Sequence, residues 1–182
     1  MIFGHAEHGL WYSGLLKGKN MAVIKKNICH CGLTGKDYRS CCGLYHTGAR
    51  VTDRSPLEVL MSRYSAFCES NGEYLLETWH HDFRPDTTAK KFSREIKNGG
   101  KWIKLKVNGV LVNPERTEAM IRYELSYRDA SGVGRSTCVS NFVFEDGRWF
   151  YTDEAENTDM NALSPELDSA DTVRAELDLI AG

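Results

Sequence analysis

The chain has 182 residues, of which 41% are apolar and 26% are charged, with a formal net charge of −2 at pH 7. These values are ordinary for a globular protein, fit one moderate domain with an appendage, and give no overall signature of nucleic-acid binding. No apolar run reaches the roughly 18–20 residues that cross a bilayer, so we expect a cytoplasmic protein without a membrane span.

Residues 1–27 are expected to be an N-terminal extension to the folded part of the chain. The segment lacks the basic start and the continuous apolar core of a secretory signal. Met21 is a candidate for the natural translation start, in which case residues 1–20 lie upstream of it. Apolar residues at helical spacing would allow the extension to dock on the body or on a neighbouring copy. They are Trp11, Tyr12, Leu15 and Leu16.

Four of the six cysteines fall within fourteen residues, as Cys-x-Cys, nine intervening residues and Cys-Cys. They are Cys29, Cys31, Cys41 and Cys42. Two close pairs of thiolates separated by a short loop can supply the four tetrahedral ligands that Zn(II) takes. Because four thiolates leave no open coordination position, we expect a structural zinc rather than a catalytic one.

Disulfides, a redox pair and histidine ligation are the alternatives to a four-thiolate zinc site. Disulfides need an oxidising compartment, which nothing in the chain indicates, and a bond between the adjacent Cys41 and Cys42 requires a strained ring. The Cys-x-x-Cys spacing of a redox pair is absent. His30 lies between two of the cysteines and could replace one as a ligand, and His46 is a more remote substitute. We favour the four thiolates.

The residues after the cluster predict helices. Ser55 is a suitable N-cap and Pro56 a suitable first residue for a helix that ends before Asn71-Gly72. A second helix is expected over 74–79, and a third over 85–97, closed by Asn98-Gly99-Gly100. The first helix carries an apolar stripe at i, i+3, i+4, i+7, i+10 and i+11. Its members are Leu57, Leu60, Met61, Tyr64, Phe67 and Cys68.

After the helices, apolar and polar residues alternate along the chain. This period of two predicts strands over 102–107, 117–128, 135–145 and 149–152. Glu145-Asp-Gly-Arg148 indicates a tight hairpin between the last two. Cys68 and Cys138 are expected to be core thiols without a reactive role. Helices followed by antiparallel hairpins predict an α+β fold, with the helices on one face of a curved sheet.

Residues 156–182 are expected to form an acidic tail that ends in a helix. Ser164-Pro165-Glu166 indicates the start of this helix, and apolar residues recur along it at positions 170, 173, 177 and 180. We expect the helix to dock on the body or on a second subunit, so a homodimer is one expected state.

These motifs resemble the YchJ-like family. Cys29-His-Cys-Gly followed by Gly35-Lys-Asp-Tyr-Arg-Ser-Cys-Cys42 is similar to the SEC-C motif, a zinc knuckle also found at the C-terminus of the SecA translocation motor. The segments Pro56–Phe67 and Tyr74–His80 are similar to YchJ-like proteins, and the resemblance runs from about residue 28 to 153. The resemblance implies a knuckle over 28–50 and a nuclear-transport-factor-2-like (cystatin-like) α+β cone over 51–155. It does not imply a particular enzymatic reaction.

Three features depart from the family pattern. The knuckle loop is one residue longer than usual, and an acidic tail stands where many members carry a second knuckle. The strand that often reads Ser-Arg-Phe has Ser140-Asn141-Phe142 here, which removes a charge.

The first function hypothesis is a zinc-stabilised binding or adaptor module. Residues 1–50 hold seven basic and two acidic residues, and a rigid knuckle would present Lys36, Tyr38 and Arg39. This surface suits an acidic protein or RNA phosphates, with Tyr38 available for stacking. The resemblance to SecA-like knuckles implies ribosome, chaperone or export components, hence an unidentified protein or ribonucleoprotein partner. The structural alternative is that the knuckle only clamps the N-terminal region onto the cone.

The second hypothesis is an enzyme or small-ligand binder that uses a cavity in the cone. His80 is the candidate general base, with Asp153 or Glu124 to orient it. Arg63 is expected to form a structural ion pair, with ligand binding as the alternative. No nucleophile–base pair, phosphate loop or open metal site can be read from the sequence, so we favour the module. Candidates to line the cavity, or simply to fill the core, are Tyr64, Trp79, His80, Trp102, Tyr123, Phe142 and Tyr151.

Overall fold

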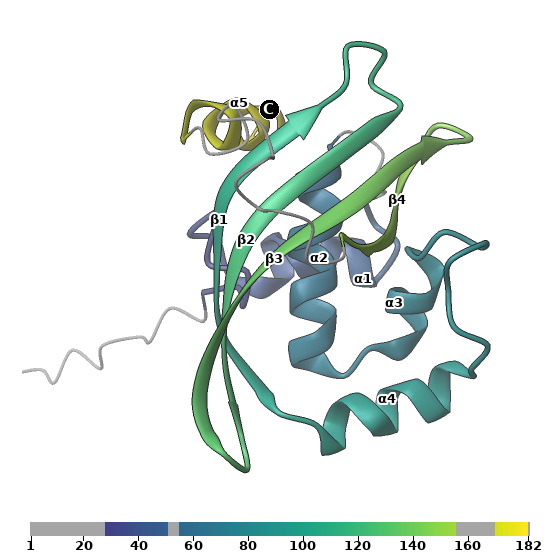
Figure 1. Cartoon of the computed structure of the whole chain (residues 1–182), viewed down its shortest axis with the longest axis vertical. Coiled ribbons are helices and arrows are strands. Elements are labelled where there is room, and N and C mark those ends of the chain that lie inside the picture. The colour runs from purple at the N-terminus through teal and green to yellow at the C-terminus, as the bar shows by residue number, and fades with distance from the viewer. Residues whose placement is uncertain (1–27, 51–54, 156–169, 182) are drawn as a thin grey trace, which may run out of the picture.

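A curved antiparallel sheet wraps around one long helix in the described part of the chain (Figure 1). The computed structural model describes residues 28–50, 55–155 and 170–181. Its sheet has four strands in the order β1-β2-β3-β4: β1 Lys101–Val112, β2 Glu118–Asp129, β3 Gly132–Glu145 and β4 Arg148–Glu154. The interpretations of residues 1–27 and of a helix start at 164–166 lie outside the described residues.

Helix α2, Pro56–Glu69, is the centre of the fold. The Ser55 hydroxyl accepts a hydrogen bond from the Leu57 amide, as its predicted N-cap role requires, and Ser70 ends the helix in the left-handed region at φ 56°. Residues 56–66 of α2 are all buried. A helix that is buried all round needs cover on every side, and here the sheet covers one side and the cysteine-containing segment another.

Two shorter helices complete the layer on this side of the sheet (Figure 1). Helix α3, Gly72–Glu77, starts earlier than predicted and ends before Trp79, which instead forms a bridge to Tyr151 of β4. Helix α4, Ala89–Asn98, starts four residues later than predicted. Its N-cap is Thr88, whose side chain accepts a hydrogen bond from the Lys91 amide.

The sheet agrees with the predicted alternating pattern: β1, β3 and β4 are longer than expected, and β2 has the predicted length but is shifted by one residue. Ala119, Ile121, Tyr123 and Leu125 of β2 are buried on the face toward α2. Asp146 and Gly147 have φ values of 50° and 80° in the predicted β3–β4 hairpin. Two irregularities in the β1–β2 register help the sheet to curve. The α+β class and the helix-on-curved-sheet arrangement are confirmed.

Helix α5, Ala170–Ala181, lies against β1 (Figure 1). The Val110 amide donates to the Thr172 hydroxyl at 3.2 Å, and the Ser55 hydroxyl donates to the Glu176 carboxylate. Ile180 is buried, as its place in the predicted apolar stripe requires. The tail helix therefore docks on the body of its own chain. Within the described ranges, no helix is long and apolar enough to cross a membrane.

Candidate metal centre and cone cavity

The first cysteine pair lies in a tight backbone loop. The Cys29 amide donates to the Lys36 carbonyl at 2.9 Å, and Gly32 and Gly35 have φ values of 67° and 66°, which glycine adopts without strain. The loop thereby turns back on itself and brings Cys29 and Cys31 to one side.

A short helical segment carries the second pair. The 3-10 turn η1, Tyr38–Ser40, is capped by the Asp37 side chain, and helix α1, Cys42–His46, follows it directly. At Gly43 the helix passes so close to the Tyr38 carbonyl that a Cβ would lie 2.7 Å from its oxygen. Glycine after the Cys-Cys pair lets these turns pack together and aims both thiols at the loop.

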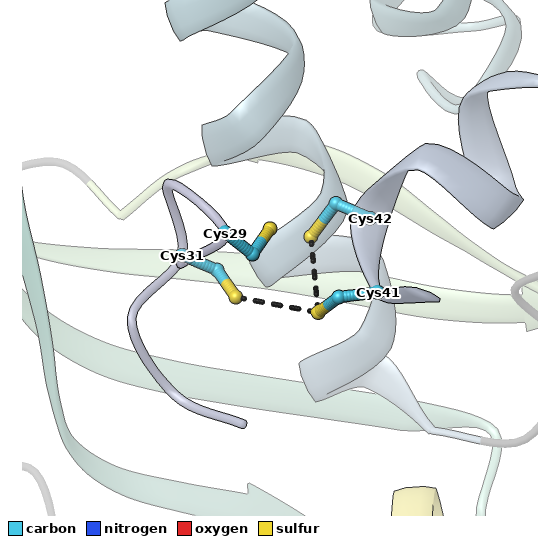
Figure 2. A group of neighbouring side chains, drawn as sticks. All are labelled: Cys29, Cys31, Cys41 and Cys42. Atoms are coloured by element: carbon cyan, nitrogen blue, oxygen red, sulfur yellow. Dashed lines mark hydrogen bonds between the residues drawn. The ribbon is translucent and has the colours of Figure 1, made fainter. Parts of the chain in front are cut away.

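The four sulfur atoms converge between the loop and α1 (Figure 2). All lie within 4.8 Å of one another, with 3.7 Å between Cys31 and Cys41 and 3.9 Å between Cys41 and Cys42. A tetrahedron with metal–sulfur bonds of about 2.3 Å has edges of about 3.8 Å. The cysteines are free, and these sulfur–sulfur distances are far above the roughly 2.05 Å of a disulfide. The cluster therefore has the size and chemistry of a tetrahedral metal site.

The four cysteines are also buried, with at most 4% of each residue exposed. The pKa of Cys29 is lowered because the thiols of Cys31, Cys41 and Cys42 donate hydrogen bonds to it. The pKa of Cys42 is raised because the other three thiols are close to it and because it is itself buried. Thiols that must donate to one another cannot all ionise together, so a cation that replaces their protons would relieve the conflict. The donor set fits a soft metal ion.

The two candidate histidine ligands are engaged elsewhere. His30 Nε2 lies 2.6 Å from a Glu69 carboxylate oxygen. His46 Nε2 donates to the Ser62 carbonyl at 2.9 Å, which leaves Nδ1 to accept from the Tyr38 hydroxyl at 2.8 Å. Both rings lie outside the group of converging ligand atoms. They attach the knuckle (residues 28–50) to α2 instead.

Further contacts join the knuckle to the same helix. The Cys42 thiol donates to the Met61 carbonyl at 3.4 Å. The Tyr45 hydroxyl donates to Glu58 at 2.5 Å, and Arg50 lies 2.9 Å from the same carboxylate oxygen. Glu58 has no exposed surface, so this ion pair is shielded from solvent on one side. The cysteine cluster and α2 thus form one buried unit.

The residues predicted to meet a partner divide into two kinds. Lys36 and Arg39 are exposed and have no ion-pair partner among the residues that the structure describes. Tyr38 is half-buried, its hydroxyl is bonded to His46, and its ring contacts the rings of His30 and His46. Tyr38 therefore holds the loop in place, and the two cations remain on the surface.

A cavity of 340 Å³ lies between α2, α4 and the sheet. Of the residues predicted to line it, five do: Tyr64, Trp79, Trp102, Tyr123 and Tyr151. Its wall is mainly apolar, and its polar members include Arg63, Ser140 and Glu154. Sequence reasoning did not assign Arg63 to this wall, although it lies three residues after Leu60 and four before Phe67, which line the cavity from the same face of α2.

His80 and Phe142 do not line this cavity. Both face a separate depression outside the cone, between the end of α3 and the strands. His80 Nδ1 accepts from the Asp82 amide at 3.3 Å, and Nε2 donates to Glu145 at 2.8 Å. The predicted orienting carboxylates are wrong, because Glu124 pairs with Lys106 and Asp153 accepts from Asn141. His80 is oriented by a residue that the sequence did not suggest.

The remaining cysteines do not join the cluster. Cys68 and Cys138 are half-buried rather than fully buried, and burial raises the pKa of each thiol to about 11. At neutral pH they are protonated and weakly nucleophilic.

Comparison with known proteins agrees with this architecture. The family model described as "YchJ, middle NTF2-like domain" matches residues 55–154, which is more than half of the chain. The chain belongs to the YchJ family. A UPF0225 protein of Xanthomonas campestris is 36% identical over 128 residues, covering 69% of this chain and 92% of that protein. A UPF0225 protein of Bordetella pertussis is 35% identical over 126 residues, covering 69% and 90%.

Solved structures similar to this YchJ-family chain include two SEC-C motif proteins. The one from Rhodopseudomonas palustris has a TM-score of 0.61 and 23% identity, and covers 70% of this chain and 96% of that one. The one from Psychrobacter arcticus has a TM-score of 0.59 and 20% identity, and covers 71% and 81%. At these identities the likeness concerns the fold, which is nuclear-transport-factor-2-like as the resemblance implied.

Proposed function

We propose that this protein is a binding module in which one Zn(II), held by Cys29, Cys31, Cys41 and Cys42, fixes a SEC-C knuckle to α2. The observation that carries the proposal is the convergence of four buried sulfurs at tetrahedral spacing. Zinc suits them because it is soft, accepts four thiolates and has no geometric preference beyond the tetrahedron. With four protein ligands the ion has no position for water or substrate, so its role is structural.

The knuckle is too small to fold through a core of its own. In such segments the free energy of metal binding is the free energy of folding. Once formed, the knuckle packs on α2 through His46, Tyr45 and Arg50. Zinc would therefore stabilise the attachment of the knuckle to α2 and also the shape of the surface that the knuckle presents.

That surface includes the exposed cations Lys36 and Arg39, held in place by the bonded Tyr38. We infer that they meet an anionic partner, an acidic protein or a ribonucleoprotein, in the setting of ribosome, chaperone or export components. His80 lies outside the cone cavity, so we do not assign it as a general base for a ligand bound there.

Metal content is the first test. Protein purified without chelator should contain one zinc per chain by mass spectrometry. After unfolding with the metal retained, only Cys68 and Cys138 should react with a thiol reagent. A metal-free protein with disulfides among the four clustered cysteines would contradict the zinc site and favour a redox role.

The partner surface is tested by charge reversal. Lys36→Glu together with Arg39→Glu should abolish recovery of specific partners, while Lys90→Glu with Lys97→Glu on the exposed face of α4 should not. Both pairs change the net charge equally, and neither touches a buried contact. The same set of partners on all three proteins would show that the knuckle cations do not bind them.

A further inference from the structure

Arg63 is a buried cation at the wall of the cone cavity. It extends from α2, and only 5% of its surface is exposed. Arginine is almost never buried to this degree unless it is paired. The ion pair expected from the sequence is absent, since no carboxylate within 28–50, 55–155 or 170–181 pairs with Arg63. The contacts around Arg63 must therefore explain how a buried cation without an ion-pair partner is stabilised.

The hydrogen bonds of Arg63 use one end of the guanidinium. Nη1 donates to the Leu75 carbonyl at 2.6 Å and to the Thr78 hydroxyl at 2.9 Å, which accounts for both of its N–H groups. Within the described part of the chain, Nε and Nη2 donate to no protein acceptor. These two atoms form one edge of the planar group, with two parallel N–H bonds.

Aromatic rings replace part of the lost hydration. The guanidinium carbon lies 4.3 Å from the centre of the Tyr151 ring and 5.2 Å from that of Trp79. Burial lowers the pKa of Arg63 to about 10, so the group stays charged at neutral pH. A charge without a counter-ion in an apolar cavity is costly, and a bound anion would relieve that cost.

We propose that the cone cavity binds a small carboxylate with an apolar body, and that its two oxygens accept from Nε and Nη2 of Arg63. A carboxylate matches the paired N–H bonds of this edge in a bidentate arrangement. The body of the ligand lies against the aromatic wall, which includes Tyr64, Trp79 and Trp102. The volume of 340 Å³ is at the small end of the range of ligand pockets.

Two neighbouring groups narrow the ligand class. The Tyr151 hydroxyl has no hydrogen-bond partner among the described residues and lines the same cavity, so it can donate to the carboxylate. Glu154 is exposed and also lines the cavity, where its charge repels a dianion such as a phosphate monoester more strongly than a monocarboxylate. The inference is independent of the zinc site and of the partner surface.

Arg63 also links α2 to the end of α3. The alternative to ligand binding is that Arg63 serves only as this structural link, or brace. A brace predicts that substitution changes stability and nothing else. A ligand anchor predicts in addition that the protein prefers a carboxylate over a neutral molecule of the same shape. The experiment compares these two outcomes with 2-naphthoate, its neutral counterpart 2-naphthamide, and naphthyl phosphate.

Binding is followed by the fluorescence of Trp79 and Trp102, which line the cavity. Wild type should bind 2-naphthoate about tenfold or more tightly than 2-naphthamide, because hydrogen bonds to charged groups are worth more than neutral ones. Naphthyl phosphate should bind more weakly than the carboxylate. Arg63→Lys, which keeps the charge but loses the paired edge, should remove most of the preference. The matched control Arg94→Lys, on the exposed face of α4, should keep it.

A second measurement on the unaltered protein covers the case in which Arg63→Lys does not fold. The Nε–H resonance of Arg63 in a ¹⁵N spectrum should move downfield with 2-naphthoate and stay in place with 2-naphthamide. The proposal is overturned if wild type shows no preference for the carboxylate, if neither probe binds, or if the Nε–H resonance does not respond. It is also overturned if a folded Arg63→Lys protein retains the full preference.

Discussion

The two sides of α2 differ in how completely their polar side chains are bonded within the protein. On the knuckle side, polar side chains are bonded within the protein: Tyr45 and Arg50 to Glu58, and His46 to Ser62 and Tyr38. On the cavity side, Tyr123 and Ser140 are bonded to each other, but Arg63 uses only one end of its guanidinium and the Tyr151 hydroxyl has no partner among the described residues.

This difference separates a structural region from a candidate binding region. Groups that are bonded to one another stabilise a fold and have little left to offer a ligand. Groups that are buried without bonds cost stability, and their persistence is most simply explained by a molecule that completes them. If the comparison is correct, substitutions on the knuckle side should cost stability, and substitutions of unused groups on the cavity side should not.

The largest effect is expected for the cysteine cluster. Cys42→Ser should lose the proposed metal and lower the free energy of unfolding by about 4 kcal/mol or more, because the knuckle then has no means of folding. Urea unfolding with metal analysis checks this. The control Cys68→Ser, at a half-buried thiol outside the cluster, should keep the metal and cost about 1 kcal/mol. Equal stability of the two variants would mean that the cluster does not stabilise the protein.

The partly buried ion pair of Arg50 and Glu58 should give the next largest effect. Arg50→Met removes the cation beside Glu58, which has no exposed surface, and should cost about 3 kcal/mol. Arg39→Met, at an exposed arginine, should change stability by less than about 0.5 kcal/mol. Adding Glu58→Gln to Arg50→Met should recover part of the loss in urea unfolding, since the uncompensated charge is then gone. A similar cost for both arginines would contradict the buried ion pair.

Removing one tyrosine hydroxyl on each side of α2 compares the knuckle side with the cavity side directly. Tyr45→Phe should cost about 2 kcal/mol, because it removes a hydrogen bond to a buried carboxylate. Tyr151→Phe should change stability by less than about 0.5 kcal/mol, because no described residue accepts from its hydroxyl. Each substitution deletes one oxygen atom, so thermal and urea unfolding can be compared without a volume correction. Equal losses would remove the distinction drawn between the two sides of α2.

The sequence predicted those parts of the fold that depend on neighbours along the chain. The apolar period of α2, its Ser55 cap and the Asp146-Gly147 hairpin are local signals, and all three are present. The start of α4 was wrong because Pro85 and Thr88 are both good helix starts, and only the structure selects Thr88. Trp79 left the predicted helix because its partner, Tyr151, belongs to the distant strand β4.

The candidate sites, like the fold, could be predicted only where they depend on residues close together in the chain. All four cysteines lie in one short segment, so their spacing alone indicated a cluster that the structure brings together. The partner of His80 is Glu145, 65 residues away, and no spacing rule selects it over Glu124 or Asp153. The unused edge of Arg63 depends on which acceptors the packed cone brings within hydrogen-bond reach, and among the described residues both hydrogen bonds of Arg63 use Nη1.

The smallest effect should come from the pH dependence of His46. Burial lowers the pKa of this ring, which is neutral while it accepts from Tyr38 and donates to Ser62. As the pH falls, the unfolded chain therefore binds the proton first. The stability that neutral His46 contributes is complete above the unfolded pKa of about 6.5 and is lost as the pH falls toward the lower folded value. At pH 7.5, His46→Gln should be about 1 kcal/mol less stable than wild type in urea unfolding, and at pH 5.5 this difference should narrow. Both proteins carry the same cysteines, so metal release in acid affects them alike. If the stability difference between the two proteins stays constant or widens, His46 is not held neutral by its hydrogen bonds with Tyr38 and Ser62.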